Sequence, residues 1–100
     1  MMMEVTILSR DHCHLCHVAL RIARHVQVDT PFTLRSVDIT HDTRLLALYR
    51  HRIPVVLIDQ DERLAGKITE RELRAALKKT RWSKSISRIL SRLGFHPNRG

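Results

Sequence analysis

The sequence predicts one α/β domain with a mixed four-stranded sheet, and three observations lead to this prediction. The chain has 100 residues, of which 43% are hydrophobic and 28% are charged, which is the composition of a single folded domain. Patterns typical of a strand, a helix and a second strand follow one another near the N-terminus, which implies parallel strands joined by a right-handed crossover. A short turn later in the chain separates two further strands, and such a turn implies an antiparallel pair.

The first half of the chain predicts two strands on either side of a helix. Residues 4–8 have the composition of a short buried strand. From Cys13 to about His25, apolar residues recur at helical spacing. The segment 29–31 ends this helix, because it closes with a proline. Residues 32–39 alternate apolar with polar side chains and predict the second strand.

The second half predicts a helix, a hairpin and another helix. Four segments follow in order: a helix at 42–49 with Thr40 or Asp42 as its N-cap, a strand at 54–58, a turn at 59–62 and a strand at 63–65. Thr69 and Glu72 then have the spacing of a capping box, in which each side chain accepts a backbone N–H of the other residue. This box predicts a third helix that ends near Lys79. The complete predicted order is βαβαββα.

The net charge of +8 is confined to the end of the chain. Residues 1–72 carry ten Lys or Arg and ten Asp or Glu, whereas residues 73–100 carry eight Lys or Arg and no acidic residue. A neutral body with a basic tail disfavours nucleic-acid binding by the whole domain. The first glycine is Gly66, and the spacing of the three glycines excludes a glycine-rich phosphate loop or dinucleotide turn.

The N-terminal residues show neither the basic start nor the apolar core of a signal peptide. The longest apolar run is also too short for a transmembrane helix. The predicted location is therefore the cytoplasm.

Residues 80–100 are predicted to form a basic helical extension of a domain that spans residues 1–79. An amphipathic helix is expected from about Ser83 to Leu93. Its apolar stripe consists of Trp82, Ile86, Ile89, Leu90 and Leu93, and its basic face of Lys84, Arg88 and Arg92. Three roles are open, and packing of the stripe on the domain is favoured. The others are binding of residues 81–93 to an anionic membrane surface, and docking to an acidic partner or to phosphates. With one aromatic residue in this helix, no specific nucleic-acid recognition is predicted.

Cys13 and Cys16 are the only cysteines and form a C-x-x-C motif at the start of the first helix. A disulfide across so short a loop removes little chain entropy, so a purely structural role is disfavoured. Residues three apart on a helix share a face, which lets the two sulfurs meet. The helix start stabilises a thiolate by about 0.3–2 kcal/mol, or about one pKa unit, and Arg10, His12 or His14 can add to this. We predict Cys13 as the exposed nucleophile and Cys16 as the resolving thiol.

The order of elements and three short motifs resemble the thioredoxin superfamily, and within it the glutaredoxin-like small proteins. The motifs are Cys13-His14-Leu15-Cys16, Ile53-Pro54 and Gly66, and the resemblance covers about residues 4–79. It implies a thioredoxin-like fold with the strand order 2-1-3-4. It also implies that Pro54 is cis and faces the cysteines, and that the Ile53 backbone is offered to a bound thiol substrate.

The resemblance further implies glutathione as a co-substrate and no bound cofactor. Arg10 matches the basic residue that glutaredoxins place near the glutathione thiol, and Lys67 and Thr69 match the region that binds its far carboxylate. The Gly-Gly and paired Asp usual in that region are absent, and His14-Leu15 replaces the usual Pro-Tyr. The predicted activity is thiol–disulfide exchange with a disulfide-bearing protein or glutathione, carried out by a monomer.

A non-enzymatic module that binds a metal or docks a partner is the alternative prediction. Zinc could take its ligands from a cluster of five residues, namely His12, Cys13, His14, Cys16 and His17. An iron–sulfur cluster shared by two subunits is a second form of this alternative, known for glutaredoxin relatives. Attachment of c-type haem is disfavoured, because the only methionines are residues 1–3 and leave no distal ligand.

Overall fold

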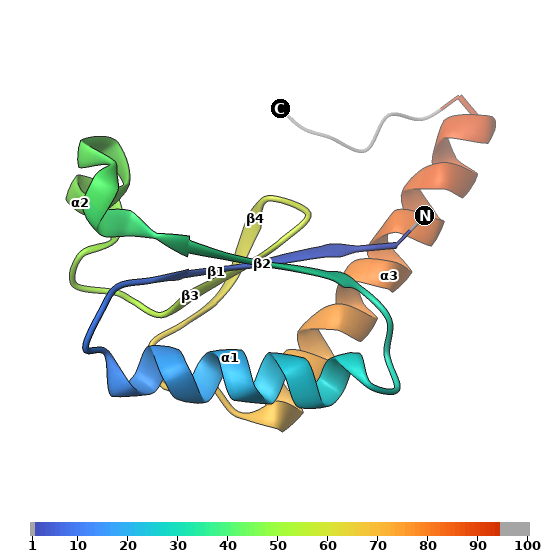
Figure 1. Ribbon diagram of the computed structural model, residues 1–100. Helices are drawn as coiled ribbons and strands as arrows, with labels where there is room; N and C mark the ends of the chain where they lie inside the picture. The colour runs from blue at the N-terminus through green and yellow to red at the C-terminus, as the bar shows by residue number, and fades with distance from the viewer. Residues whose placement is uncertain (1, 95–100) are drawn as a thin grey trace.

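The structure is a computed structural model that describes residues 2–94. Its elements follow one another in this order (Figure 1): β1 (Glu4–Ser9), α1 (His14–Gln27), β2 (Thr33–Asp38), the short 3-10 helix η1 (Ile39–His41), α2 (Thr43–Tyr49), β3 (Val55–Ile58), β4 (Asp61–Ala65) and α3 (Glu70–Arg92). The predicted order βαβαββα is confirmed, and η1 is an addition to it. Residues 95–100 of the predicted extension lie outside the described residues.

The four strands form one mixed sheet in the order β2-β1-β3-β4, as predicted. β1 runs parallel to β2 and antiparallel to β3, and β4 pairs antiparallel with β3. The β3–β4 turn is shorter than predicted, because Asp61 and Glu62 already belong to β4. It consists of Asp59 and Gln60, whose φ angles of 52° and 74° are those that a two-residue hairpin turn requires.

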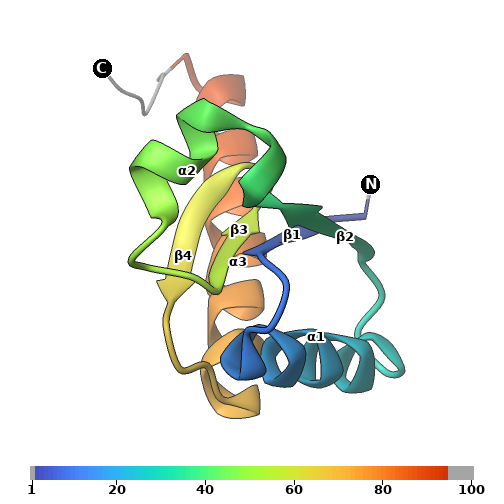
Figure 2. The same ribbon diagram turned by 60° about the vertical axis from the view of Figure 1, so that its left-hand side comes forward.

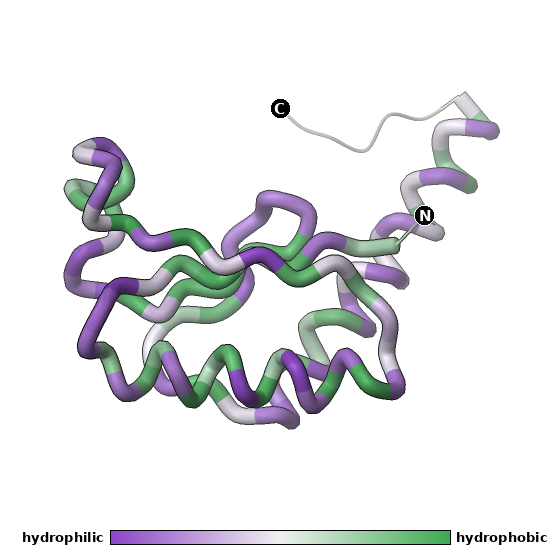
Figure 3. The backbone as a smooth tube through the Cα atoms, viewed as in Figure 1, coloured by the Kyte–Doolittle hydropathy of each residue, from purple (hydrophilic) through white to green (hydrophobic). Residues whose placement is uncertain are grey.

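Helices cover both faces of this sheet (Figures 1 and 2). α1 and the first half of α3 lie together on one face, and α2 lies on the other. Because successive side chains of a strand point to opposite faces of the sheet, the central strands contribute side chains to two hydrophobic cores. The larger core, toward α1 and α3, takes Val5 and Ile7 from β1 and Val56 and Ile58 from β3. Figure 3 shows β3 in the green of apolar residues and the β3–β4 turn in purple.

Helix α3 is longer than predicted. One helix was expected to end near Lys79 and a second to begin at Ser83, but a single helix runs from Glu70 to Arg92. The capping box at its start is confirmed: the side chain of Thr69 accepts the N–H of Glu72, and the Glu72 side chain accepts the N–H of Thr69. The sequence has no glycine or proline between Glu70 and Leu93, so nothing in the chain interrupts the helix at the expected break.

The two halves of α3 bury different faces. In the first half, Leu73, Leu77 and Thr80 are buried against the domain. About two turns after Leu77 and Thr80, the same side of the helix carries Lys84 and Ser87. The apolar side chains of the second half point elsewhere: Trp82 is 66% exposed, Ile89 56%, Leu93 68% and Ile86 37%, whereas Leu90 is half-buried. The expectation that this stripe packs on the domain is therefore wrong for these four residues, because the polar face of the second half continues the buried face of the first.

Among the described residues, no helix has the length and apolar character needed to cross a lipid bilayer.

Candidate functional site

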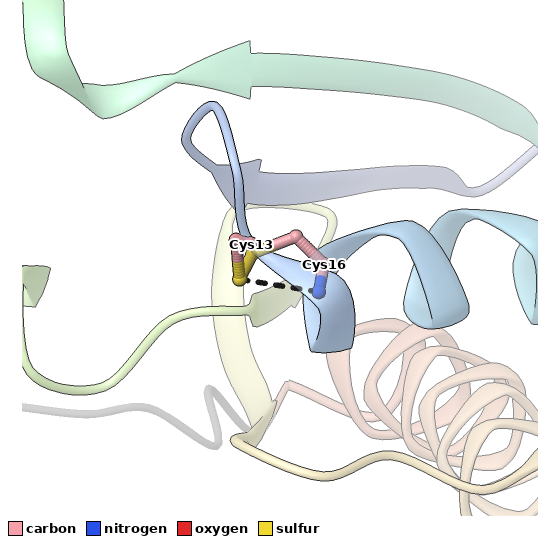
Figure 4. Close-up of a disulfide and its surroundings, with 2 residues drawn as sticks. All are labelled: Cys13 and Cys16. Atoms are coloured by element: carbon pink, nitrogen blue, oxygen red, sulfur yellow. Dashed lines mark hydrogen bonds between the residues drawn. A yellow bond between two sulfur atoms is a disulfide. The ribbon is translucent and has the colours of Figure 1, made fainter.

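The two cysteines form a disulfide at the start of α1 (Figure 4). Cys13 is the N-cap residue and Cys16 lies in the first turn, with their Cα atoms 5.2 Å apart. This spacing is within the range of ordinary disulfides. The two residues differ in exposure, because Cys16 is only 2% exposed whereas Cys13 is half-buried. A substrate can therefore reach Cys13 more readily than Cys16.

A tight turn places Cys13 at the helix start. After Ser9, the last residue of β1, residues 10–12 reverse the chain so that α1 runs back along the sheet (Figure 1). His12 has a φ of 60°, in the left-handed region that histidine occupies more readily than most residues. The turn ends there, and Cys13 takes the extended conformation of an N-cap, with φ −109° and ψ 104°.

The helix N-terminus supplies the local electrostatics. The backbone N–H of Cys16 donates to Sγ of Cys13 at 3.3 Å, shown as the dashed line in Figure 4. No acidic residue lies in the first turn of α1 to oppose negative charge there. In the reduced protein, a Cys13 thiolate at this position would receive an N–H hydrogen bond and the positive end of the helix dipole.

Pro54 and Gly66 lie at the same end of the strands as this turn. In the strand register, Leu8 pairs with Val55, so that Pro54 lies beside the end of β1, where the chain leaves for Cys13. The Ile53–Pro54 peptide bond is cis, as the resemblance implied, and Pro54 is buried while Ile53 is half-buried. Gly66 donates its N–H to the carbonyl oxygen of Pro54 at 2.8 Å.

The backbone conformation of residue 66 favours a glycine at this end of the strands. Its φ is +80°, in the left-handed region that glycine adopts without steric cost. This conformation turns the chain from β4 into the segment that leads to α3. The end of β1, the beginning of β3 and the end of β4 are thus held together by the strand register and by the Gly66–Pro54 hydrogen bond.

The remaining predicted site residues are accessible, with one difference from expectation. Arg10 and His14 are exposed on either side of Cys13 in the sequence, and Lys67 is exposed in the segment after Gly66. Thr69 is also exposed, but its hydroxyl group takes part in the capping box: Oγ1 accepts the Glu72 N–H at 3.2 Å and lies 3.0 Å from the Glu72 carboxylate. Thr69 therefore has a structural task that is independent of any ligand.

The five residues of the alternative metal site lie around the start of α1. Within residues 2–94, no three His, Cys, Asp or Glu side chains are arranged to hold a metal ion. His12, His14 and His17 are each exposed, and both sulfurs are engaged with each other.

Sequence reasoning missed the contacts that hold the segment before Pro54. The Arg52 guanidinium forms an ion pair with Glu62 of β4. It also lies over the ring of Tyr49, 5.4 Å from the ring centroid, which is within the range of a cation–π contact. No short motif marks these residues, because their partners come from two different elements.

Comparison with known families and structures agrees with this architecture. The family model described as a glutaredoxin-like domain matches residues 4–78. A solution structure of a protein from Nitrosomonas europaea is similar with a TM-score of 0.67 and 23% identity, over 75% of this chain and 91% of that one. A crystal structure of a protein from X. campestris has a TM-score of 0.66 and 29% identity, over 75% and 96%.

Thioredoxins have the same fold at lower identity. A mutant thioredoxin from Halobacterium salinarum has a TM-score of 0.61 and 16% identity, over 77% of this chain and 73% of that one. Comparison with curated protein sequences gives no match.

Proposed function

Because the chain belongs to the glutaredoxin-like domain family, we propose that it catalyses thiol–disulfide exchange through Cys13 and Cys16. One observation carries the proposal: the two sulfurs are joined at a helix N-terminus, and only Cys13 is open to a substrate. A disulfide that closes so short a loop adds little stability, so its formation and reduction are best understood as the chemistry of the site.

The exchange proceeds in two displacement steps. In the reduced protein, the Cys13 thiolate attacks one sulfur of a substrate disulfide, whose S–S bond breaks as one substrate thiolate leaves and takes up a proton from water. The Cys16 thiolate then attacks Sγ of Cys13, and the second substrate thiolate leaves and also takes up a proton from water. The substrate disulfide has gained two electrons and two protons, and the protein retains the Cys13–Cys16 disulfide. An external thiol, such as glutathione or a protein dithiol, reverses these steps and restores the reduced protein.

The neighbouring residues are assigned to substrate binding. Arg10 and His14 stabilise the Cys13 thiolate, and the backbone of Ile53, fixed by the adjacent Pro54, pairs with the bound thiol substrate. Lys67 and Thr69 would contact the far carboxylate of glutathione, and Gly66 would lie in the same substrate-binding region. The support for these assignments is that Pro54 and Gly66 lie near the end of β1, from which the chain leads to Cys13.

The substrates proposed are disulfide-bearing proteins and glutathione, with no bound cofactor and with the monomer as the active form. The proposed location is the cytoplasm, where the glutathione and thioredoxin systems keep thiols reduced.

Turnover of a small mixed disulfide with glutathione, and reduction of a protein disulfide with a dithiol, test the proposal. We expect Cys13→Ser to abolish both activities. Cys16→Ser should abolish reduction of the protein disulfide, which needs both cysteines. It should retain turnover of the mixed disulfide with glutathione, which needs only Cys13. Leu48→Ser, a substitution of an exposed apolar residue on α2, is a matched control that should leave both unchanged.

Two results would contradict the proposal. One is unchanged turnover in the Cys13→Ser protein. The other is one zinc or iron atom per chain, or one cluster per two chains, in anaerobically purified protein that has no exchange activity, which would favour the metal-binding alternative.

A further inference from the structure

The second half of α3 presents an apolar surface that the domain does not cover. Trp82, Ile89 and Leu93 are each more than half exposed, and Ile86 is 37% exposed. These residues follow one another at spacings of three and four, so they occupy one side of the helix over three turns. The side of the helix that continues toward the domain carries Lys84 instead.

A shallow pocket extends this surface toward the first half of α3. It has a volume of about 420 Å³ and is lined by Ala75, Lys78, Lys79 and Trp82. Two lysines and the tryptophan thus line the same pocket. The exposed surface therefore combines an aromatic side chain, aliphatic side chains and cations on one helix.

The same segment is strongly basic. Residues 81–93 contain Arg81, Lys84, Arg88 and Arg92 and no acidic residue. Lys84 is paired with Asp59, but the three arginines form no ion pair with any of the described carboxylates. Arg81, Lys84 and Arg88 also line a hollow of about 400 Å³, together with Met2 and Met3. The positive charge of the three arginines is thus available to an external anion along one flank of the stripe.

The combination of stripe and charge decides between the partners that such a helix could have. A second copy of the chain would bring two sets of cations together without carboxylates to neutralise them, and the stripe is short for a coiled coil. A nucleic acid would match the charge and leave the apolar stripe in water. A bilayer rich in acidic phospholipids matches both features, because its headgroups bind the cations while Trp82 and the aliphatic side chains enter the boundary region.

We propose that residues 81–93 bind reversibly, parallel to the surface, to membranes that contain acidic phospholipids. The start of α1 and the end of α3 lie at opposite ends of the molecule in both ribbon views (Figures 1 and 2). The cysteines would therefore remain accessible on the bound protein. This inference is independent of the redox function, because it depends only on α3.

Trp82 is the only tryptophan of the chain, so its fluorescence reports directly on the stripe. Vesicles of phosphatidylcholine with phosphatidylglycerol should shift its emission to the blue and protect it from an aqueous quencher. Vesicles of phosphatidylcholine alone should have little effect. Raising the salt concentration from about 0.1 M to about 1 M should weaken binding several-fold, because the Debye length falls from about 10 Å to about 3 Å.

Two pairs of substitutions separate the apolar and the charged contributions. Ile86→Ser with Ile89→Ser should reduce vesicle partitioning about tenfold or more, because both side chains would enter the boundary region. Arg88→Gln with Arg92→Gln should also reduce it and flatten its salt dependence. Leu48→Ser on α2 removes an apolar side chain that is 59% exposed, close to the 56% of Ile89, and should leave partitioning unchanged. Urea unfolding of each variant checks that the fold is retained.

Three results would overturn the proposal. Vesicle binding without a blue shift, and unaffected by the two Ile substitutions, would mean attraction by charge alone. A blue shift that appears with protein concentration in the absence of vesicles, with a dimer in sedimentation, would assign the stripe to self-association. Binding to heparin or to RNA without binding to acidic vesicles would assign the basic flank to a polyanion.

Discussion

Lys84, in the second half of α3, forms an ion pair with Asp59 in the β3–β4 turn. The other carboxylate oxygen of Asp59 accepts the backbone N–H of Glu4 at 2.9 Å, and the N–H of Asp59 donates to the carbonyl oxygen of Glu4 at 2.8 Å. One turn residue therefore joins the long helix, the hairpin and the first residue of β1. The beginning of the basic segment is fixed to the domain by this pair.

Substitution of Asp59 should be more costly than substitution of Lys84. Asp59→Ala is expected to lower the free energy of unfolding by about 2 kcal/mol, because it removes the ion pair and leaves the Glu4 N–H without its acceptor. Lys84→Met should lower it by about 0.5–1 kcal/mol, because the Lys84 side chain is half exposed. Urea unfolding measures both, with Lys78→Met as a control on an exposed cation of the same helix. Strictly additive effects in the double variant would show that the two residues do not interact.

The same carboxylate predicts a pH dependence of stability. Burial raises the pKa of Asp59, but the Lys84 ammonium, the Glu4 N–H and the charge of Arg63 outweigh burial and hold the pKa below its usual 3.8. Because the folded state binds its proton less readily than the unfolded chain does, the stabilising contribution of Asp59 is present above about pH 4 and is lost as the pH falls through the folded pKa.

The measurement is the difference in unfolding free energy between the unsubstituted protein and Asp59→Asn. This difference should be constant near neutral pH and should shrink as the pH falls from about 5 to about 3. Asp61→Asn, which removes an exposed carboxylate at the start of β4, serves as a control for general effects of charge. A difference that does not change with pH would mean that Asp59 contributes nothing through its ionised form.

The reduced protein should show two cysteines of different reactivity. Alkylation of Cys13 should be at least about tenfold faster than that of Cys16, because Cys13 is accessible and Cys16 is 2% exposed. The pH dependence of the Cys13 reaction should give a thiol pKa below that of free cysteine, since the helix start stabilises the thiolate. Mass spectrometry of the separate peptides follows each cysteine. Equal rates, or a Cys13 pKa at the free value, would contradict the assigned roles.

The capping box predicts that Thr69 contributes to stability, whereas Lys67 does not. Thr69→Ala should lower the free energy of unfolding by about 1 kcal/mol, because it removes the N-cap of α3. Thr69→Asp supplies another N-cap acceptor and should restore most of that loss. Lys67→Ala should leave stability unchanged and raise the KM for glutathione, because Lys67 is exposed and belongs to no cap. If Lys67→Ala leaves the KM unchanged, the proposed contact with the glutathione carboxylate is wrong.

Much of the domain could be predicted because its elements carry local signals. The β-branched run at Val55–Ile58 defines a strand, and Thr69 and Glu72 define a helix start. The position of the cysteines at the beginning of α1 follows from the helical spacing after Cys13, and the disulfide from the separation of three residues. These features depend on neighbours in the chain, which a sequence displays directly.

The course of the C-terminal helix could not be predicted in the same way. The apolar spacing of Trp82, Ile86 and Ile89 identifies an amphipathic helix, but it does not state which way that helix faces. The orientation is set by Leu73 and Leu77, which are buried one to three turns earlier on the same uninterrupted helix. The contacts around Arg52 and Asp59 were missed for a related reason, because their partners are distant in sequence.

Because α3 is one uninterrupted helix, the number of residues in it determines which side of its second half faces the domain. An insertion or deletion can change that side without changing any of the existing residues. Each residue turns a helix by about 100°, so the insertion of two residues near Thr80 would rotate the second half by about 200°. Trp82 and Ile86 would then face the domain, and Lys84 would be carried to the outer side. Composition and charge would be almost the same, yet the apolar stripe would lie on the side of α3 that continues toward the domain. Insertions and deletions in this short junction should thus alter the surface of the molecule far more than substitutions at the same positions.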